Sequence, residues 1–425
     1  MMPAAYLGIL LIALLGMPLF LVLLSAAGVG FSFAGLDLQV LGIELYRITE
    51  STVLMALPMF AFVGFLLSEA NTAQRLVRLS QAVLGWLPGG MMLIALLTCA
   101  FFTMLTGGSG VTIVALGALL YPALTQSHYD KTFSLGLLTT SGSLGLLLPP
   151  AIPLILYGII AQQMDVPGVD IVDLFMAGLI PAVLMIVVLY IYGLWANRHQ
   201  PIAKVPFEWQ ECRAALREAI WELLIPVIIL GGVFSGVLVL SEAAAVTALY
   251  VLLIETLVYR EISPRALMRA LRESLVMVGG ILLILGAAMA FTNLLVFNNI
   301  PFILFDLVSE HVSHPLVFLI ILNLLLLVLG AFLDIFAAIV IMVPLLLPLA
   351  LQYGIDPIHL GVIFVANMQI GYFTPPVGMN LFIASYRFKK PITELYRATL
   401  PFLLVLLGVV LIITYVPWLS LVLVR

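Results

Sequence analysis

Small and hydroxyl-bearing residues gather at Thr106–Gly110, in the middle of an apolar stretch, where they could bind a cation. Glycines allow backbone carbonyls to approach a ligand closely, and Thr106 and Ser109 add hydroxyl oxygens. Hard cations prefer several oxygen ligands, so this set suits sodium. We expect its partner in space to be the segment Ser141–Leu148, because a helix that ends there exposes carbonyls at its negative dipole end.

A second set of the same kind runs from Gly330 to Asp334, with Gly371, Thr374 and Val377 further along the chain. Its distinctive member is Asp334, because a carboxylate within a membrane costs at least about 2.5 kcal/mol and marks a functional candidate. Asp334 could ligate a cation, cap the helix that follows it, or bind and release a proton. The first set has no carboxylate at the matching place, so the two sites would not be equivalent.

Between the two sets we expect a cavity for a small solute, because several half-helix ends would point toward it. The N-terminal ends of helices favour anions. No arginine or lysine is expected at membrane depth, so backbone amides, hydroxyls and helix dipoles would hold an anion, helped by a bound cation. The polar or small residues placed to line this cavity are Gly108, Ser109, Thr112, Asn367 and Asn380.

Two proline pairs, Pro149-Pro150 and Pro375-Pro376, must position these residues. Proline removes a backbone donor and clashes with the preceding turn, and it pushes the residue before it out of the helical region. Each pair therefore breaks a helix that is long enough to span a membrane. The two pairs lie 226 positions apart, and paired breaks in the two halves of a chain indicate the binding site of a secondary transporter.

The composition indicates an all-α polytopic membrane protein. The 425 residues are 64% hydrophobic and 9% charged, and a span needs about 20 apolar residues. Two longer blocks, 88–124 and 315–350, are interrupted halfway by small or polar residues, which favours re-entrant helical hairpins. We expect spans or broken helices near 3–27, 48–68, 131–160, 173–195, 220–238, 240–259, 274–297, 357–386 and 400–423.

Positive charge predicts the orientation. With a cytoplasmic N-terminus and two re-entrant hairpins, all basic residues except Arg47 and Arg425 would lie in the cytoplasm, and the C-terminus would be periplasmic. The first hairpin would then enter from the cytoplasm and the second from outside. The two halves would form an inverted repeat, the arrangement expected for alternating access.

The predicted inverted repeat divides the chain into four parts. Residues 1–70 would be N-terminal scaffold spans; 71–195 the first repeat; 196–272 cytoplasmic arms and further scaffold spans; and 273–425 the second repeat. Amphipathic stretches at 70–85, 206–219, 263–273 and 300–311 are predicted to lie in the membrane interface, ordinary loops being the alternative.

Sequence patterns typical of enzymes and of nucleic-acid binding do not occur. There is no HExxH motif and no glycine-rich phosphate loop before a lysine, and Cys99 and Cys212 lack the spacing of a metal site or a disulfide framework. We expect no organic cofactor, no nucleic-acid partner and no enzyme activity. Membrane lipid is the expected surrounding.

Several stretches together resemble the large membrane subunit of tripartite ATP-independent periplasmic (TRAP) transporters, of the DctM type. They are Leu87–Gly90, Thr106–Gly110, Ser143–Leu154, Glu242–Ala245, Gly354–Pro357 and Gly371–Asn380. The resemblance implies sodium-coupled uptake of a small organic acid across a bacterial inner membrane by an elevator mechanism. It also implies two partners, a periplasmic binding protein (DctP-type) and a four-span membrane subunit (DctQ-type).

Together with the residue types, the resemblance assigns two sodium sites. The first would use Thr106, Gly107, Ser109, Ser143, Gly145 and Leu148; the second would use Gly330, Asp334, Gly371, Thr374 and Val377. The first tip reads Gly-Gly-Ser-Gly-Val where many members of the family are richer in serine, so its exact ligands stay open.

Two alternatives to this function also stay open, as does the use of protons instead of sodium as the coupling ion. One is a stand-alone cation-coupled anion carrier or exchanger with the same paired breaks. The other, ranked last, is a channel, because no repeated ring of carbonyls or charges occurs.

Overall fold

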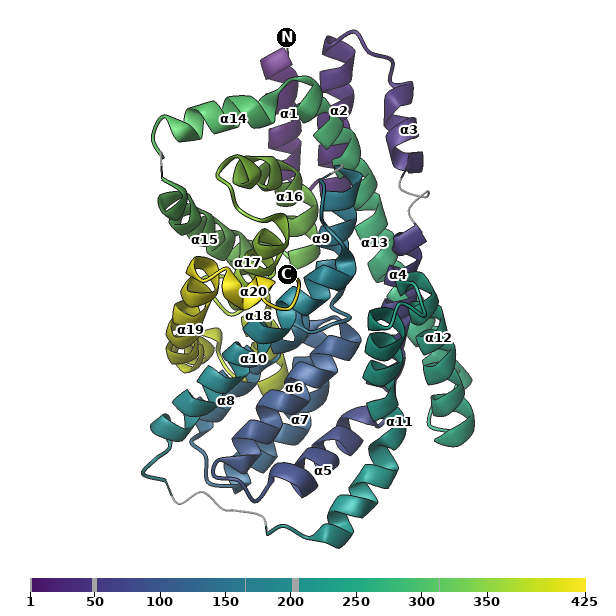
Figure 1. Cartoon of the computed structure of the whole chain (residues 1–425), viewed down its shortest axis with the longest axis vertical. Coiled ribbons are helices and arrows are strands. Elements are labelled where there is room, and N and C mark those ends of the chain that lie inside the picture. Colours follow the sequence, from purple (N-terminus) through teal and green to yellow (C-terminus); the bar gives the residue numbers. More distant parts are fainter. Residues whose placement is uncertain (1, 48–51, 165, 201–205, 313) are drawn as a thin grey trace.

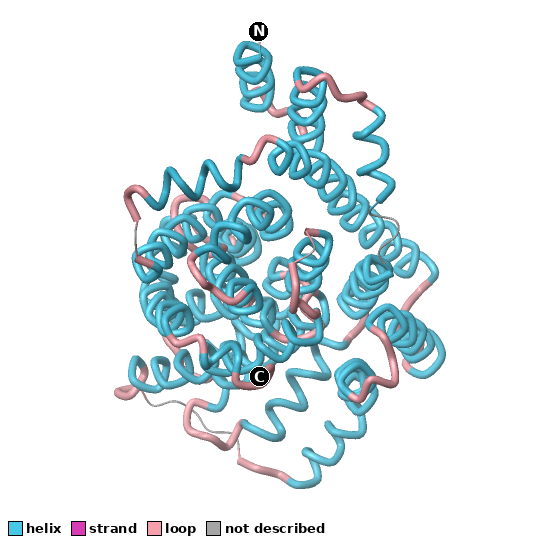
Figure 2. The backbone as a smooth tube through the Cα atoms, turned by 45° about the horizontal axis from the view of Figure 1, so that its top comes forward, coloured by secondary structure: helices cyan, strands magenta, loops and turns pink. Residues whose placement is uncertain are grey.

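The computed structural model describes residues 2–47, 52–164, 166–200, 206–312 and 314–425, and every regular element in these ranges is a helix (Figure 2). Among the described residues, eight helices are long and apolar enough to cross a membrane, or nine if the bent pair Val53–Glu69 and Thr72–Leu84 forms one span. The prediction of an all-α polytopic membrane protein is confirmed.

The first predicted hairpin and broken helix follow each other in the chain. Helices α6 (Gly90–Thr106) and α7 (Ser109–Gln126) form the hairpin. The broken helix consists of α8 (Lys131–Ser141), the 3-10 turn η3 (Leu144–Leu147) and α9 (Ile152–Gln163). The interruption lies where the sequence predicts it, at Pro149-Pro150, whose peptide bond is cis.

The same order of elements recurs in the second half. Helices α15 (Pro315–Phe332) and α16 (Ile335–Gln352) form the second hairpin, and α17 (Pro357–Gly371) and α18 (Met379–Phe388) flank the second break. The Pro375-Pro376 bond is also cis. Figure 1 shows the first hairpin in the lower part of the molecule and the second in the upper part.

Matching aspartates begin the two broken helices. Asp130 accepts hydrogen bonds from the amides of Thr132 and Phe133 at 2.8 and 3.1 Å. Asp356 accepts from Ile358 and His359 at 2.9 and 3.3 Å. Aspartate at this position satisfies amides that a helix start leaves unpaired, so the sequence fixes both starting points locally.

The broken helices occupy the centre of the fold. All residues of α17 from Ile358 to Gly371 are buried, as are Ser134–Ser141 of α8 and Ile152–Ala161 of α9. Long helices α10 (Ile171–Ala196) and α19 (Ile392–Tyr415) pack against them, and the short α20 (Trp418–Leu421) follows. Unwound backbone is tolerated at membrane depth only where protein or a cavity covers it, and this arrangement meets that condition.

A second group of helices lies beside this core and includes α4 (Ala56–Glu69), preceded by the 3-10 turn η2 (Thr52–Met55). Helices α12 (Leu240–Leu253) and α13 (Pro264–Phe297) pack against α4. Helix α13 also packs against α2 (Leu19–Phe33) and α3 (Gln39–Arg47).

The single first span predicted for 3–27 is wrong. The structure has α1 (Met2–Leu14) and α2, separated by Gly16 at φ +99° and by Pro18. The two helices lie side by side, and the Tyr6 hydroxyl donates to the Ala26 carbonyl at 3.3 Å (Figure 1).

The predicted interfacial stretches have two outcomes. Helices α5 (Thr72–Leu84) and α14 (Ile300–Ser309) are separate elements, as expected. In contrast, 206–219 and 263–273 are not separate arms, because α11 (Trp209–Phe234) and α13 continue without a break into the spans that follow. Helix α11 continues even through Pro226, which lies near the start of its apolar part.

Candidate cation and solute site

The tip of the first hairpin turns at Gly107. Its φ is +67°, and a Cβ atom there would lie 2.6 Å from Cδ1 of Ile152. Glycine is the residue that adopts this conformation without strain, so the turn explains part of the small-residue tip. The neighbouring Thr106 hydroxyl is buried and has no hydrogen-bond partner among the described residues. An unpaired buried hydroxyl suits a ligand that brings positive charge.

Thr103, which the sequence reasoning missed, joins the first hairpin to the first break. Its hydroxyl lies 2.7 Å from the Thr112 hydroxyl and 2.8 Å from the Gly142 carbonyl oxygen, to which it donates. Gly145 fits directly against the backbone of α6, where an added Cβ would clash with the Ala100 carbonyl. The first hairpin and the first break are therefore in contact, whereas sodium site 1 itself stays a prediction.

Asp334 caps α16 at the second tip. Its Oδ2 accepts from the Phe336 amide at 3.0 Å, and its Oδ1 accepts from the Tyr372 hydroxyl at 3.0 Å. The Ile335 amide in turn donates to the Tyr372 hydroxyl oxygen at 3.0 Å. The structure thus supports the capping role and adds Tyr372, which the sequence reasoning did not single out. Carboxylate oxygens keep further lone pairs for a cation.

Gly330 and Gly371 bring the second hairpin and the second break into backbone contact. A Cβ atom on Gly371 would lie 2.6 Å from the Gly330 Cα atom. Thr374 follows, and its hydroxyl donates to the Ile370 carbonyl at 2.8 Å. The Gly378 amide donates to the Ala331 carbonyl at 2.8 Å. The second hairpin and the second break are therefore in backbone contact, whereas sodium site 2 itself stays a prediction.

The first hairpin also touches the second broken helix. The Ser109 hydroxyl donates to Oδ1 of Asn380 at 2.7 Å, and Nδ2 of Asn380 donates to the Thr139 carbonyl at 3.3 Å. One residue further, Gly110 faces Ile383, whose Cδ1 would lie 2.6 Å from an added Cβ. Two residues predicted to bind the solute are thus in direct contact although they lie far apart in sequence.

The two breaks contact each other near the middle of the fold. The Ser143 hydroxyl donates to the Gln369 carbonyl at 3.1 Å. The buried oxygens Thr140 Oγ1 and Gln369 Oε1 have no partner among the described residues. The first break therefore contacts α17 at η3 and through the Ser143 hydroxyl.

Three predicted site residues have other surroundings. The Asn367 amide donates to Asn323 Oδ1 at 2.7 Å, so this side chain points to α15. Leu148 turns its side chain into an apolar cavity, so its carbonyl is the group left for a ligand. Val377 is half-buried between Pro376 and Gly378.

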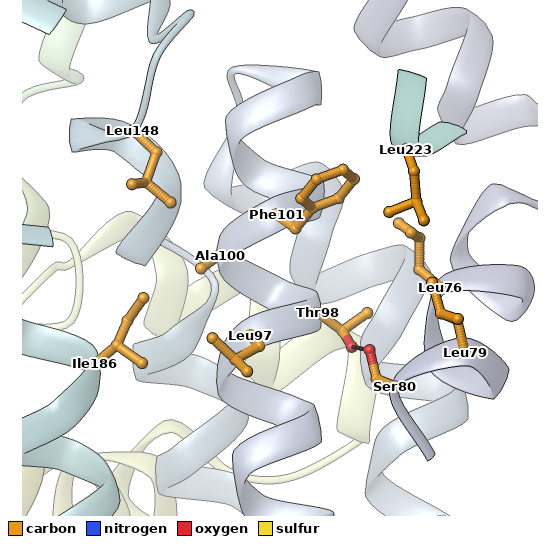
Figure 3. A pocket seen from close by; sticks show the side chains of 10 residues that line it. All are labelled: Leu76, Leu79, Ser80, Leu97, Thr98, Ala100, Phe101, Leu148, Ile186 and Leu223. Carbon is orange, nitrogen blue, oxygen red and sulfur yellow. Dashed lines mark hydrogen bonds between the residues drawn. The ribbon is translucent and has the colours of Figure 1, made fainter. Parts of the chain in front are cut away.

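Two pockets border these elements, and they differ in chemistry. Figure 3 shows an apolar cavity of about 230 Å³ between α5, α6, α10 and α11, in which the Thr98 hydroxyl donates to Ser80 at 3.1 Å. A larger pocket of about 450 Å³ lies between α4 and α13 on one side and α7 and α18 on the other. Its lining includes Ser68, Glu69, Gly110, Glu273 and Ile383, so it reaches the residue next to Ser109.

Comparisons with known proteins agree with this architecture. The family model described as "Tripartite ATP-independent periplasmic transporter, DctM component" matches residues 6–419. The C4-dicarboxylate TRAP transporter large permease protein DctM of Rhodobacter capsulatus is 35% identical over 97% of this chain and 96% of its own length. The sialic acid TRAP transporter large permease protein SiaM of Vibrio cholerae is 31% identical over 95% and 91%. The ectoine/5-hydroxyectoine large permease protein UehC of Ruegeria pomeroyi is 29% identical over 98% and 97%.

A solved structure shares the fold. The YdaH transporter of Alcanivorax borkumensis superposes with a TM-score of 0.62 at 17% identity, over 89% of this chain and 87% of that one. Paired hairpins, paired broken helices and these similarities define a multi-pass membrane transporter permease. The chain belongs to the DctM component family of TRAP transporters, and the resemblance noted in the sequence is confirmed.

Proposed function

We propose that this chain is the large membrane subunit of a sodium-coupled secondary transporter that imports a small organic acid. The observation that carries the proposal is the contact of each hairpin with a broken helix, at Gly145 and at Gly371. Such contacts place hydroxyls and unwound backbone carbonyls together inside the fold. Oxygen ligands with at most one carboxylate among them suit a monovalent hard cation that must be released again.

Two sodium ions would occupy the two junctions. The first junction offers oxygens of Thr103, Thr106, Ser109, Ser143 and Gly145; the second offers oxygens of Gly330, Asp334, Gly371, Thr374 and Val377. The unpaired buried hydroxyl of Thr106 supports the first assignment. At the second junction, Asp334 caps α16, which is a structural role. In the proposed site Asp334 would also ligate the ion.

The organic acid would bind between the tips, at Ser109 and Asn380. These two side chains are hydrogen-bonded to each other, and the adjacent pocket gives a route to the surface. The named relatives are permeases for C4-dicarboxylates, sialic acid and ectoine, so a small carboxylate is the expected class of cargo. Gly108 and Thr112 are adjacent, whereas Asn367 would act through its buried Oδ1.

We propose an elevator movement of the hairpins and broken helices against the second group of helices. Helix α4 packs against α6 and α13 packs against α16, and at one close contact a Cβ on Gly64 of α4 would lie 2.6 Å from the Thr106 Cα atom. Because Gly64 has no side chain, the first tip could approach the second group of helices and leave it again without any rearrangement of a side chain at position 64. The opposite placement of the two hairpins in Figure 1 supports an inverted repeat.

We infer the orientation in the membrane from the basic residues. Arg75 and Arg78 belong to α5 and Arg217 to α11, and the end of the molecule at which α11 begins in Figure 1 would face the cytoplasm. The N-terminus lies at the opposite end in Figure 1. We therefore place it on the periplasmic side of the bacterial inner membrane, as a revision of the cytoplasmic N-terminus predicted from the sequence, and keep the C-terminus periplasmic. A DctQ-type subunit and a DctP-type binding protein would complete the transporter.

Reconstitution tests this function. The chain and its small subunit are placed in proteoliposomes, and uptake of labelled C4-dicarboxylate, sialic acid and ectoine is measured with and without the binding protein. We expect uptake of one cargo only with an inward sodium gradient and the binding protein present. Uptake by this chain alone would instead support the stand-alone carrier or exchanger, and uptake that ignores every cation gradient would overturn the proposal.

A further inference from the structure

Arg75 of α5 is the centre of a buried group of charged side chains that lies apart from the transport site. Only 4% of Arg75 is exposed, and Glu222 and Glu255 are each 1% exposed. The Arg75 guanidinium forms an ion pair with Glu222 of α11 and lies 2.7 Å from Glu261 and 3.2 Å from Glu255. Four segments of the chain therefore meet at one cation.

The charges of this group do not balance. One guanidinium faces three carboxylates, so the group would carry two net negative charges if all three were ionised. Buried charges without partners are strongly unfavourable, and such groups neutralise instead. The group therefore needs additional positive charge.

Two of the carboxylates are well paired. Glu222 also accepts from the Tyr259 hydroxyl at 2.9 Å, and the Tyr259 ring lies 3.7 Å from the Arg75 guanidinium carbon. Glu261 also accepts from the Asn71 amide at 2.9 Å. Although burial opposes it, hydrogen bonds from Asn71 and Arg75 hold the pKa of Glu261 below its ordinary value. Each of these two carboxylates therefore has a hydrogen-bond donor on both of its oxygens.

Glu255 differs from the other two. Its Oε1 accepts weakly, from Thr72 at 3.4 Å and from Arg75 at 3.2 Å. Its Oε2 is buried and has no hydrogen-bond partner in the described part of the chain. Glu255 lies in a π-helical turn, Ile254–Val258, and single π-turns within helices are frequent at functional sites.

We propose that Glu255 is a proton-binding site, occupied by one proton on Oε2. As a neutral acid, Glu255 keeps Oε1 as the carbonyl that accepts from Arg75 and Thr72, and Oε2 becomes a hydroxyl. A metal cation would need several free oxygens, whereas the other carboxylate oxygens in contact here already serve Arg75, Tyr259 and Asn71. A proton needs one oxygen, and Oε2 supplies it.

The proton would control how firmly α5 is held. Helix α5 connects α4 to the first hairpin, and it packs against α11. The charged and titratable groups that face Glu255 are Arg75 of α5, Glu222 of α11, and Tyr259 and Glu261 beyond the π-turn. Loss of the proton adds a negative charge to a group that already carries an excess, and α5 is then held less firmly.

The test compares purified wild type with Glu255→Gln, which keeps the shape of the neutral acid. The matched control is Glu310→Gln at an exposed position. We expect infrared spectra to show a carboxylic-acid band that Glu255→Gln removes and Glu310→Gln keeps. We also expect the unfolding midpoint of wild type and of Glu310→Gln to fall as the pH rises, because the folded protein holds one more proton than the unfolded chain. A difference of one bound proton changes the folding equilibrium constant about tenfold per pH unit. Glu255→Gln removes this slope.

The outcomes separate this inference from the proposed function, since neither readout depends on transport. If Glu255→Gln keeps the carboxylic-acid band, or keeps the pH dependence of the unfolding midpoint, the proton site is overturned. If only Glu222→Gln removes the band, the proton belongs to Glu222 instead. If Glu255→Gln yields no folded protein, hydrogen exchange of wild type decides. Amide exchange is intrinsically faster at alkaline pH, so protection factors corrected for this effect are compared. The protection factors of Thr72–Leu84 must fall as the pH rises, and constant protection factors overturn the proposal.

Discussion

The Ser143 hydroxyl donates to the Gln369 carbonyl at 3.1 Å, and the two residues are separated by 226 positions. The two proline pairs have the same separation, so Ser143 and Gln369 occupy equivalent places in the two broken helices. Equivalent residues of two repeated units touch where the units meet. The two breaks are therefore in contact at the centre of the fold, as the sequence predicts.

Ser143→Ala should lower stability, because it leaves the buried Gln369 carbonyl without this donor. A hydrogen bond of this kind contributes about 1 kcal/mol, so the denaturation midpoint should fall modestly. Ser309→Ala, which removes an exposed hydroxyl that donates to the Asp306 carbonyl, is the control. Equal midpoints for both variants would show that the contact contributes nothing. If Ser143 also ligates sodium, half-maximal uptake by Ser143→Ala should require more sodium.

Gly371→Ala should abolish most transport while the protein still folds. The added methyl group would lie 2.6 Å from the Gly330 Cα atom, and backbone cannot move aside as a flexible side chain can. The second hairpin must then separate from the second break. Gly408→Ala is the control, because nothing lies within 4 Å of a Cβ there. Transport by Gly371→Ala at the rate of Gly408→Ala would refute the close-contact requirement.

Thr374→Val should weaken sodium activation of uptake, because it removes one oxygen and keeps the shape. Loss of about 1.4 kcal/mol of binding energy raises the half-saturating sodium concentration about tenfold. Thr399→Val is the matched control, since Thr399 of α19, like Thr374, donates its hydroxyl to the carbonyl four residues earlier, at 2.9 Å. A sodium titration of Thr374→Val that superimposes on that of wild type would remove Thr374 from the site.

Asp334→Asn should reduce transport without reducing the yield of folded protein. Asparagine also caps helices well, so it would preserve the bond from the Phe336 amide and remove only the charge. Asp334→Ala should in addition lose about 1 kcal/mol of stability, measured by denaturant unfolding. Wild-type uptake by Asp334→Asn would leave capping as the sole role of Asp334.

The sequence predicts the parts of the site that have local signals. Proline pairs mark both breaks, and small residues mark both tips. Thr103 and Tyr372 were missed because each is a single polar group in an apolar helix or break, where nothing nearby distinguishes it. A repeat argument could have found Thr103, since the offset between Pro88 and Pro315 places it opposite Gly330.

The errors at the edges of the fold have a different cause. Hydropathy averages over a window, so the chain reversal at Gly16 within an apolar run was read as one span. In α11 and α13 the composition changes along the helix without ending it, and α11 continues even through Pro226. Neither Asn380 contact could be predicted, because Ser109 and Thr139 reach it only through tertiary packing.

Direct sodium binding tests the central claim, that the two junctions hold the coupling ion. The purified protein is unfolded by heat in sodium chloride and in potassium chloride of equal concentration. At about 100 times the dissociation constant, a bound ion adds about 2.7 kcal/mol to the stability of the folded state. We predict a higher midpoint in sodium, and loss of that difference in Gly371→Ala but not in Gly408→Ala. Equal midpoints of wild type in the two salts at every concentration would contradict the claim.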